Sequence, residues 1–225
     1  MIYGAASDII APVFSRFADA DFICLVNSSR PSHLKGLILE TGSNDFEKEL
    51  KSALGRVGKE RMLVLLSAAV YQKDELFIAH SKSSIEQMVH VGIFQALMIS
   101  QILLEEMIKR KKGRLINLSS FRANAPAKGA AVYSAIKSFG NTFFSAVGLE
   151  YGRFDITSNS IAIGFAESKL LDRLEAPKLA QFKNSVSKNK FLPQGEFLDT
   201  IEFIIDSKYL NASVIDLNGG LRFLE

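Results

Sequence analysis

The chain has 225 residues, a length typical of one domain rather than two. Hydrophobic residues make up 48% and charged residues 23%, which excludes a disordered or fibrous chain. The formal net charge of +3 is too small to indicate a nucleic-acid partner.

Seven short apolar runs predict β-strands. Several are apolar on both faces, which is typical of parallel strands covered by helices on both sides. The predicted fold class is therefore α/β, a doubly wound parallel sheet in a single domain over residues 1–225. The runs are 1–3, 22–26, 37–39, 62–66, 115–118, 156–161 and 214–217.

Helical patterns alternate with these runs, at 9–19, 45–58, 84–111, 131–151, 169–184 and 195–206. Segments 93–108 and 135–149 carry more apolar residues than one sheet-facing stripe needs. A second buried face indicates a homo-oligomer, a dimer or tetramer; the alternative is overlap of helices within one subunit. The polar segment 166–194 is predicted to be a substrate loop or lid.

The single cysteine, Cys24, lies in an apolar run and predicts a buried thiol in a reducing compartment. The start of the chain lacks a basic region and soon reaches Asp8, so we expect no secretory signal. The uncharged stretch 87–104 is interrupted by polar residues, which favours a soluble helix over a membrane span. We expect a cytoplasmic protein without a membrane partner.

Tyr133 and Lys137 form the first candidate catalytic pair. Four helical residues place both side chains on one face, roughly 6 Å apart along the axis. A lysine there is expected to lower the tyrosine pKa and make the phenol a proton donor for a carbonyl. Alternatively, Tyr133 caps the first turn and Lys137 is solvated, since the chain has five tyrosines and the spacing arises by chance.

Ser120 stands thirteen residues before Tyr133 and ends the run Gly113–Ser120. Open α/β sheets bind ligands at the carboxyl ends of their strands. Strand alternation points Ser119 away from Ser120, so we favour Ser120 as the site hydroxyl. Asn117 is predicted to be structural.

These residues resemble the short-chain dehydrogenase/reductase family, most closely its 3-oxoacyl-(acyl carrier protein) reductase-like members. Ile163-Gly164 and the ending Val214-Ile215-Asp216-Leu217-Asn218-Gly219-Gly220 also fit, so the similarity runs nearly end to end. The resemblance implies a Rossmann-like fold and a nicotinamide-dependent reductase. Ser120 would polarise the substrate oxygen, Tyr133 would protonate it, and Lys137 would tune the tyrosine and hold the nicotinamide ribose.

The family's glycine-rich turn, T-G-x-x-x-G-x-G, departs from the pattern and reads Tyr3-Gly4-Ala5-Ala6-Ser7-Asp8-Ile9-Ile10. Asp8 adds a carboxylate where the phosphates should lie, and Ile10 replaces the glycine that lets helix pack on strand. Either Ser7 or Asp8 merely caps the first helix, or the dinucleotide site is weakened or lost.

Two other family markers are also missing. Leu66-Ser67-Ala68-Ala69 replaces the family's Asn-Asn-Ala-Gly, and Gly92 stands where the family often has a catalytic asparagine. His90 is either a substitute for that asparagine or a structural histidine.

NADP(H) is favoured over NAD(H), because Ser28, Ser29 and Arg30 suit a ribose 2′-phosphate and no carboxylate follows the second strand. Glu40 matches the position that contacts adenine. By resemblance, Ser168 meets the nicotinamide amide. No metal site is predicted. The full set of expected cofactor-binding residues is Gly4, Ser7, Asp8, Ile9, Ser28, Ser29, Arg30, Glu40, Ala68, Tyr133, Lys137, Gly164 and Ser168.

Two functions therefore stand open. The first is an NADP(H)-dependent reductase of a carbonyl, possibly a 3-oxoacyl group bound to an acyl carrier protein. The second is a divergent protein with weakened or lost dinucleotide binding, acting as a non-redox biosynthetic enzyme or a partner subunit. The basic run 109–112 with Arg114 is either a solvated helix end or, with Arg153, a docking site for an acidic carrier.

Overall fold

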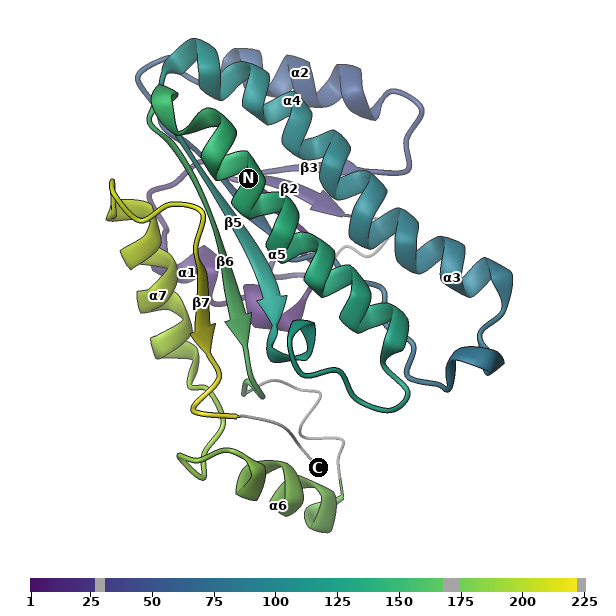
Figure 1. The fold of residues 1–225 in the computed structure, drawn as a ribbon. Helices are drawn as coiled ribbons and strands as arrows, with labels where there is room; N and C mark the ends of the chain where they lie inside the picture. The colour runs from purple at the N-terminus through teal and green to yellow at the C-terminus, as the bar shows by residue number, and fades with distance from the viewer. Residues whose placement is uncertain (27–30, 168–174, 222–225) are drawn as a thin grey trace.

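A computed structural model describes residues 1–26, 31–167 and 175–221, and its centre is a seven-stranded parallel sheet (Figure 1). The strand order is β3-β2-β1-β4-β5-β6-β7, with the reversal between β1 and β4 that characterises doubly wound folds. The predicted fold class and all seven predicted strands are confirmed. The strands are β1 (Ile2–Tyr3), β2 (Ile23–Val26), β3 (Leu37–Glu40), β4 (Leu63–Ser67), β5 (Gly113–Ser120), β6 (Ile156–Ile163) and β7 (Val214–Leu217).

Helices cover both faces of the sheet (Figure 1). On one face lie α2 (Phe46–Arg56), α4 (Gln95–Arg110) and α5 (Ala131–Tyr151), over a core that includes Leu50, Leu103 and Phe144. On the other lie α1 (Val13–Arg16) and α7 (Gln194–Asp206), over a second core that includes Phe14 and Phe197.

The long helix of the first face is built from three parts. The helix α3 (Lys82–Val89) runs through a π-helical turn, His90–Phe94, directly into α4. By length and composition, Lys82–Arg110 could cross a membrane. Here it is a core helix, because Ile99, Leu103 and Met107 are fully buried against the sheet.

The first helix is much shorter than the predicted 9–19. A 3₁₀ turn covers Asp8–Ile10, and α1 has only four residues, Val13–Arg16. Pro12 is one physical reason, because it has no N–H to bond to the carbonyl of Asp8 in a continuous helix. The regular helix predicted to begin at residue 9 is therefore absent from this described segment.

The predicted lid, 166–194, is only partly described. Ala166 pairs with Leu192, and Phe165 stacks on Phe182 of α6 (Ala176–Ser185) with ring centroids 4.5 Å apart. Within the described Ala176–Ser185, no residue is fully buried. The role of a lid stays a prediction.

Candidate active site

Ser120, Tyr133 and Lys137 come together at the carboxyl end of β5. Ser120 is the last residue of that strand, and Tyr133 and Lys137 lie one turn apart at the start of α5, which packs along β5 and β6 (Figure 1). The Ser120 hydroxyl lies near enough to Tyr133 to lower the pKa of its phenol, and Ser120 is 5% exposed. Ser120 Oγ also accepts a hydrogen bond from the backbone N–H of Arg122 at 3.2 Å.

The expected lowering of the Tyr133 pKa is wrong. Burial raises the pKa of the Tyr133 phenol, and the opposing effects of the Ser120 hydrogen bond and the nearby Arg122 charge are smaller. The carboxylate of Asp74 also raises it. Spacing alone suggested that Lys137 would dominate, whereas desolvation is the larger effect.

Lys137 is buried and held by the sheet rather than by the phenol oxygen. Its Nζ donates to the Leu118 carbonyl at 2.7 Å and lies 5.8 Å from the centroid of the Tyr133 ring. Burial lowers the pKa of this ammonium to about 8. An ammonium has three donors, so further donors are available for hydroxyl groups of a ligand.

A cleft of about 310 Å³ opens at the carboxyl ends of β1, β2 and β4. Gly4, Ser7 and Ala68 line it, together with Val26. Gly4 has φ 82°, and a Cβ there would lie 2.4 Å from the backbone nitrogen of Ala69. The remaining glycine of the turn is thus required by close backbone packing.

Glu40 is also at this edge of the sheet, because it pairs in register with Val26 at the ends of β3 and β2. Small side chains along the cleft and the spare donors of Lys137 fit the two ends of a dinucleotide. These groups have the chemistry that the adenosine and nicotinamide-ribose portions of such a cofactor require.

The middle of the site is built differently from the family pattern. Asp8 is exposed and begins a 3₁₀ turn, Ile9 packs against the α1 and α7 core, and Ile10 is fully buried. His33 Nε2 lies 3.0 Å from the carbonyl oxygen of Ala5, behind the turn. No α-helix begins in the described turn to offer its N-terminus to a pyrophosphate, which is expected to weaken binding of that group.

The remaining predicted cofactor residues divide into two groups. Gly164 follows β6, its N–H donates to the Leu217 carbonyl at 3.1 Å, and a Cβ there would lie 2.9 Å from Asn218 Cα. Ser28, Ser29, Arg30 and Ser168 lie outside the described residues.

The position of the family asparagine is closed. Gly92 lies in the π-helical turn, and a Cβ there would be 2.5 Å from Ile136 Cγ2, so a larger residue requires Ile136 to move. His90 is exposed and stacks on Phe94 with centroids 6.3 Å apart. Among the described residues, the hydrogen bond of Lys137 goes to Leu118 and not to His90. Asn117 donates to Ser160 Oγ at 3.0 Å within the sheet.

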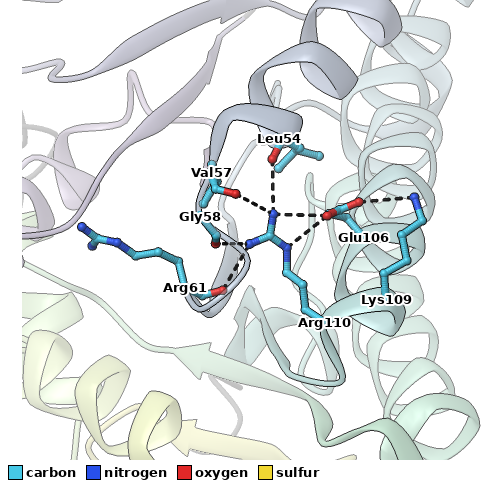
Figure 2. A network of polar contacts seen from close by, with 7 residues as sticks. All are labelled: Leu54, Val57, Gly58, Arg61, Glu106, Lys109 and Arg110. Carbon is cyan, nitrogen blue, oxygen red and sulfur yellow. Dashed lines mark hydrogen bonds and ion pairs between the residues drawn. The ribbon is translucent and has the colours of Figure 1, made fainter.

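Most of the basic run is structural rather than solvated. Arg110 donates to four backbone carbonyls, one in the last turn of α2 and three in the loop that follows it (Figure 2). Its guanidinium also forms an ion pair with Glu106 Oε1 at 3.2 Å. These carbonyls belong to Leu54, Val57, Gly58 and Arg61.

Two neighbouring cations are engaged in the same way. Lys112 donates to the Glu60 carbonyl, and the buried Arg114 donates to the carbonyls of Ile205, Gly113 and Asp155. Both lie by the amino end of β5, whereas Ser120 ends that strand about 23 Å away at about 3.3 Å per residue. Within this run, the exposed Lys109 and Lys111 remain available for docking a carrier protein.

Arg122 is a site residue that the sequence analysis missed. Its charge lowers the pKa of Tyr133, and its Cζ lies 5.2 Å from the centroid of the Phe121 ring. Its Nη1 is buried without a hydrogen-bond partner among the described residues. The only signal in the sequence is its position two residues after Ser120.

Comparison with known proteins agrees with this arrangement. The family model described as short chain dehydrogenase matches residues 39–178. A human 3-oxoacyl-[acyl-carrier-protein] reductase is 27% identical over 187 residues, covering 80% of this chain and 73% of the relative. Carbonyl reductase family member 4 of Xenopus tropicalis is 22% identical, covering 98% of this chain and 96% of the relative. A very-long-chain 3-oxoacyl-CoA reductase of Laccaria bicolor is 29% identical, covering 71% of this chain and 50% of the relative.

Proposed function

Since the chain belongs to the short-chain dehydrogenase family and is an NAD(P)-dependent carbonyl reductase, we propose that Ser120, Tyr133 and Lys137 perform its proton chemistry. We further propose NADP(H) as the preferred cofactor. The observation that carries the proposal is the convergence of three residues: Ser120 ends β5, and Tyr133 and the buried Lys137 lie one turn apart at the start of α5, near enough to Ser120 for its hydroxyl to lower the pKa of the Tyr133 phenol. The sequence of Ser28, Ser29 and Arg30 supports the choice of NADP(H).

In this proposal a bound nicotinamide supplies the hydride, and the residues of the chain handle the oxygen. Ser120 donates a hydrogen bond to the carbonyl oxygen, and Tyr133 protonates it. The raised pKa of Tyr133 keeps the phenol protonated until transfer. The positive charges of Arg122 and Lys137 then stabilise the phenolate that forms. Lys137 also holds the ribose hydroxyls, as its spare donors allow.

We propose a 3-oxoacyl group as the substrate, delivered by a carrier protein, because such groups appear in the names of several relatives. An apolar wall near the site suits an acyl chain, since Phe165 contacts the rings of Phe121, Phe182 and Phe191. The exposed cations Lys109, Lys111 and Arg153 offer an acidic carrier a docking surface at the amino end of β5, about 23 Å from Ser120, a distance that the acyl arm of the carrier would have to span. We place the enzyme in the cytoplasm, consistent with the buried free thiol of Cys24.

Substitution of the phenol tests the proposal. Tyr133→Phe is expected to lower NADPH-dependent carbonyl reduction by at least about a thousandfold, because it removes the proton donor, while leaving the melting temperature nearly unchanged. Tyr151→Phe, at the far end of the same helix, is the matched control and should keep the wild-type rate. A Tyr133→Phe enzyme with wild-type turnover contradicts the assigned role.

One observation favours the second function, a non-redox protein, namely the altered turn at Asp8 and Ile10. Fluorescence titration with NADPH separates the two. Enhancement or a spectral shift on binding supports the reductase, whereas no change at hundreds of micromolar NADPH favours the non-redox protein.

A further inference from the structure

Arg122 presents an unused charge beside the reacting groups. Its backbone N–H is fixed on Ser120 Oγ, its guanidinium lies over Phe121, and its charge acts on the phenol of Tyr133. A guanidinium stays protonated at any relevant pH and has five donors in a planar fork. The side chain is therefore positioned to act on whatever is bound next to Ser120.

The described residues around Arg122 provide no counter-ion for this charge. Among the described residues, no carboxylate lies within 4.0 Å of Arg122, and its Nη1 is buried without a partner. Asp74, the acidic group that also influences Tyr133, instead accepts a hydrogen bond from Gln72 Nε2 at 2.7 Å. A buried donor without an acceptor is costly, and an oxygen atom of a bound ligand would satisfy it.

We propose that Arg122 determines substrate specificity by binding a second, carboxyl-level oxygen of the substrate, close to the ketone that Ser120 and Tyr133 hold. A 3-oxo acid and a 3-oxoacyl thioester both provide such an oxygen, one methylene beyond the ketone. The carboxylate forms charged, paired hydrogen bonds with the guanidinium, and the thioester carbonyl forms a single weaker one. This inference rests on the proposed carbonyl reduction and adds the group that selects the substrate.

The test compares three probes that differ in the second oxygen: acetoacetate, the acetoacetyl thioester of N-acetylcysteamine, and pentan-2-one, which has none. In Arg122→Gln, all three probes are expected to lose a common factor, because Arg122 also acts on the Tyr133 phenol. Relative to pentan-2-one, kcat/KM is expected to fall about a hundredfold further for acetoacetate and about tenfold further for the thioester. Arg122→Lys should recover part of the acetoacetate rate but not the thioester rate. Lys128→Gln removes an exposed charge from the same loop and is the matched control, expected to behave as wild type.

Two results overturn the inference. One is an equal loss for all three probes, with a shifted pH profile, because Arg122 would then act only through the Tyr133 pKa. The other is a wild-type enzyme that shows no preference for acetoacetate or the thioester over pentan-2-one. Either outcome leaves the proposed reductase standing.

Binding without turnover keeps the test independent of the proposed function. Calorimetric titration of acetoacetate into Tyr133→Phe and into Tyr133→Phe/Arg122→Gln, both saturated with NADPH, should show at least tenfold weaker binding to the double variant. Equal binding, or none in either, contradicts the role of Arg122. Failure of the proposed function shows itself separately, as undiminished turnover by Tyr133→Phe.

Discussion

Burial shifts the pKa values of the Tyr133 phenol and the Lys137 ammonium toward their neutral forms. The tyrosine pKa rises and the lysine pKa falls to about 8. On raising the pH, the lysine therefore loses its charge long before the tyrosine loses its proton. Deprotonation of Lys137 is therefore expected to set the alkaline limit of activity.

We predict that kcat/KM for NADPH-dependent reduction falls as the pH rises through about 8, because the Lys137 ammonium deprotonates there. Lys137→Arg keeps a cation at all relevant pH values and should lose this limb, although at a lower overall rate. Initial rates on either side of pH 8 measure the effect. A limb that persists unchanged in Lys137→Arg assigns it to another group.

The lowered pKa of Lys137 also makes the free energy of unfolding depend on pH. The native pKa of Lys137 lies below its ordinary 10.5, so between about 8 and 10.5 the native state binds fewer protons than the unfolded state. The contribution of Lys137 to the free energy of unfolding therefore rises with pH across this window. Below about pH 8 the lysine is charged in both states, and its burial penalty is fully present.

A second prediction concerns the charge of Asp8. Asp8→Asn removes a negative charge from the turn beside the cleft and is expected to tighten NADPH binding about threefold to tenfold, with a smaller gain at high salt. Fluorescence titration measures the dissociation constant. Asp19→Asn, an exposed site beyond α1, is the control for net charge, and an equal gain there contradicts a local effect.

How far residues can be predicted from sequence depends on whether position or environment decides their role. The meeting of Ser120 with Tyr133 follows from a strand end and a helix start, so it could be predicted. The direction of the Tyr133 pKa could not, because burial outweighs the neighbouring charges. Arg122 was missed because its unpaired, buried donor is a property of the packed site.

At the scale of elements, one arginine joins the ends of two helices. Arg110 near the end of α4 satisfies four carbonyls around the end of α2, which a helix terminus otherwise leaves to water (Figure 2). Its side chain is 2% exposed, unlike that of Lys109 at 70%. The contrast separates a structural cation from a solvated one in adjacent positions.

We expect Arg110→Met to lower the free energy of unfolding by about 2–4 kcal/mol, because it removes several charged hydrogen bonds at once. Lys109→Met should change it by less than about 0.5 kcal/mol. Urea unfolding of both variants gives the comparison. Equal losses mean that the network contributes nothing specific.

Elements could be predicted where apolar patterns coincide with the covered sheet. The helix 131–151 has the bounds expected, and the seven strands differ only at their ends. Strand β5 is longer than predicted because its polar ends, Arg114 and Ser119 among them, are buried in the interior of the sheet. The predicted first helix, 9–19, is wrong because Pro12 and the buried Ile10 favour a short turn over a regular helix.

At the scale of the whole molecule, an apolar groove of about 410 Å³ lies on the outer side of α4 and α5. Leu97, Met98 and Phe143 line it, and Met98 is 39% exposed. The excess of apolar residues on these helices is thus only partly used within one subunit. A second copy of the chain packed there remains our prediction for the homo-oligomer.

Met98→Glu is expected to convert the oligomer to monomers, since it places a charge in the apolar contact. Sedimentation velocity of wild type and variant measures the change. Tyr209→Glu, fully exposed elsewhere, should keep the wild-type state. A wild-type protein that sediments as a monomer contradicts the prediction.

The two-residue β1 and four-residue α1 make the first unit of the sheet thin. Strand β1 pairs with β2 and with β4 over only two residues each, so few ladder hydrogen bonds oppose local opening, and amide protons of β2 are expected to exchange with solvent through fluctuations that leave β5 and β6 closed. A nucleotide bound across the ends of β1, β2 and β4, as we propose, would stabilise the closed form by a free energy that grows with the logarithm of its concentration above the dissociation constant. The cofactor would then act as a structural brace for the strands with the shortest ladders.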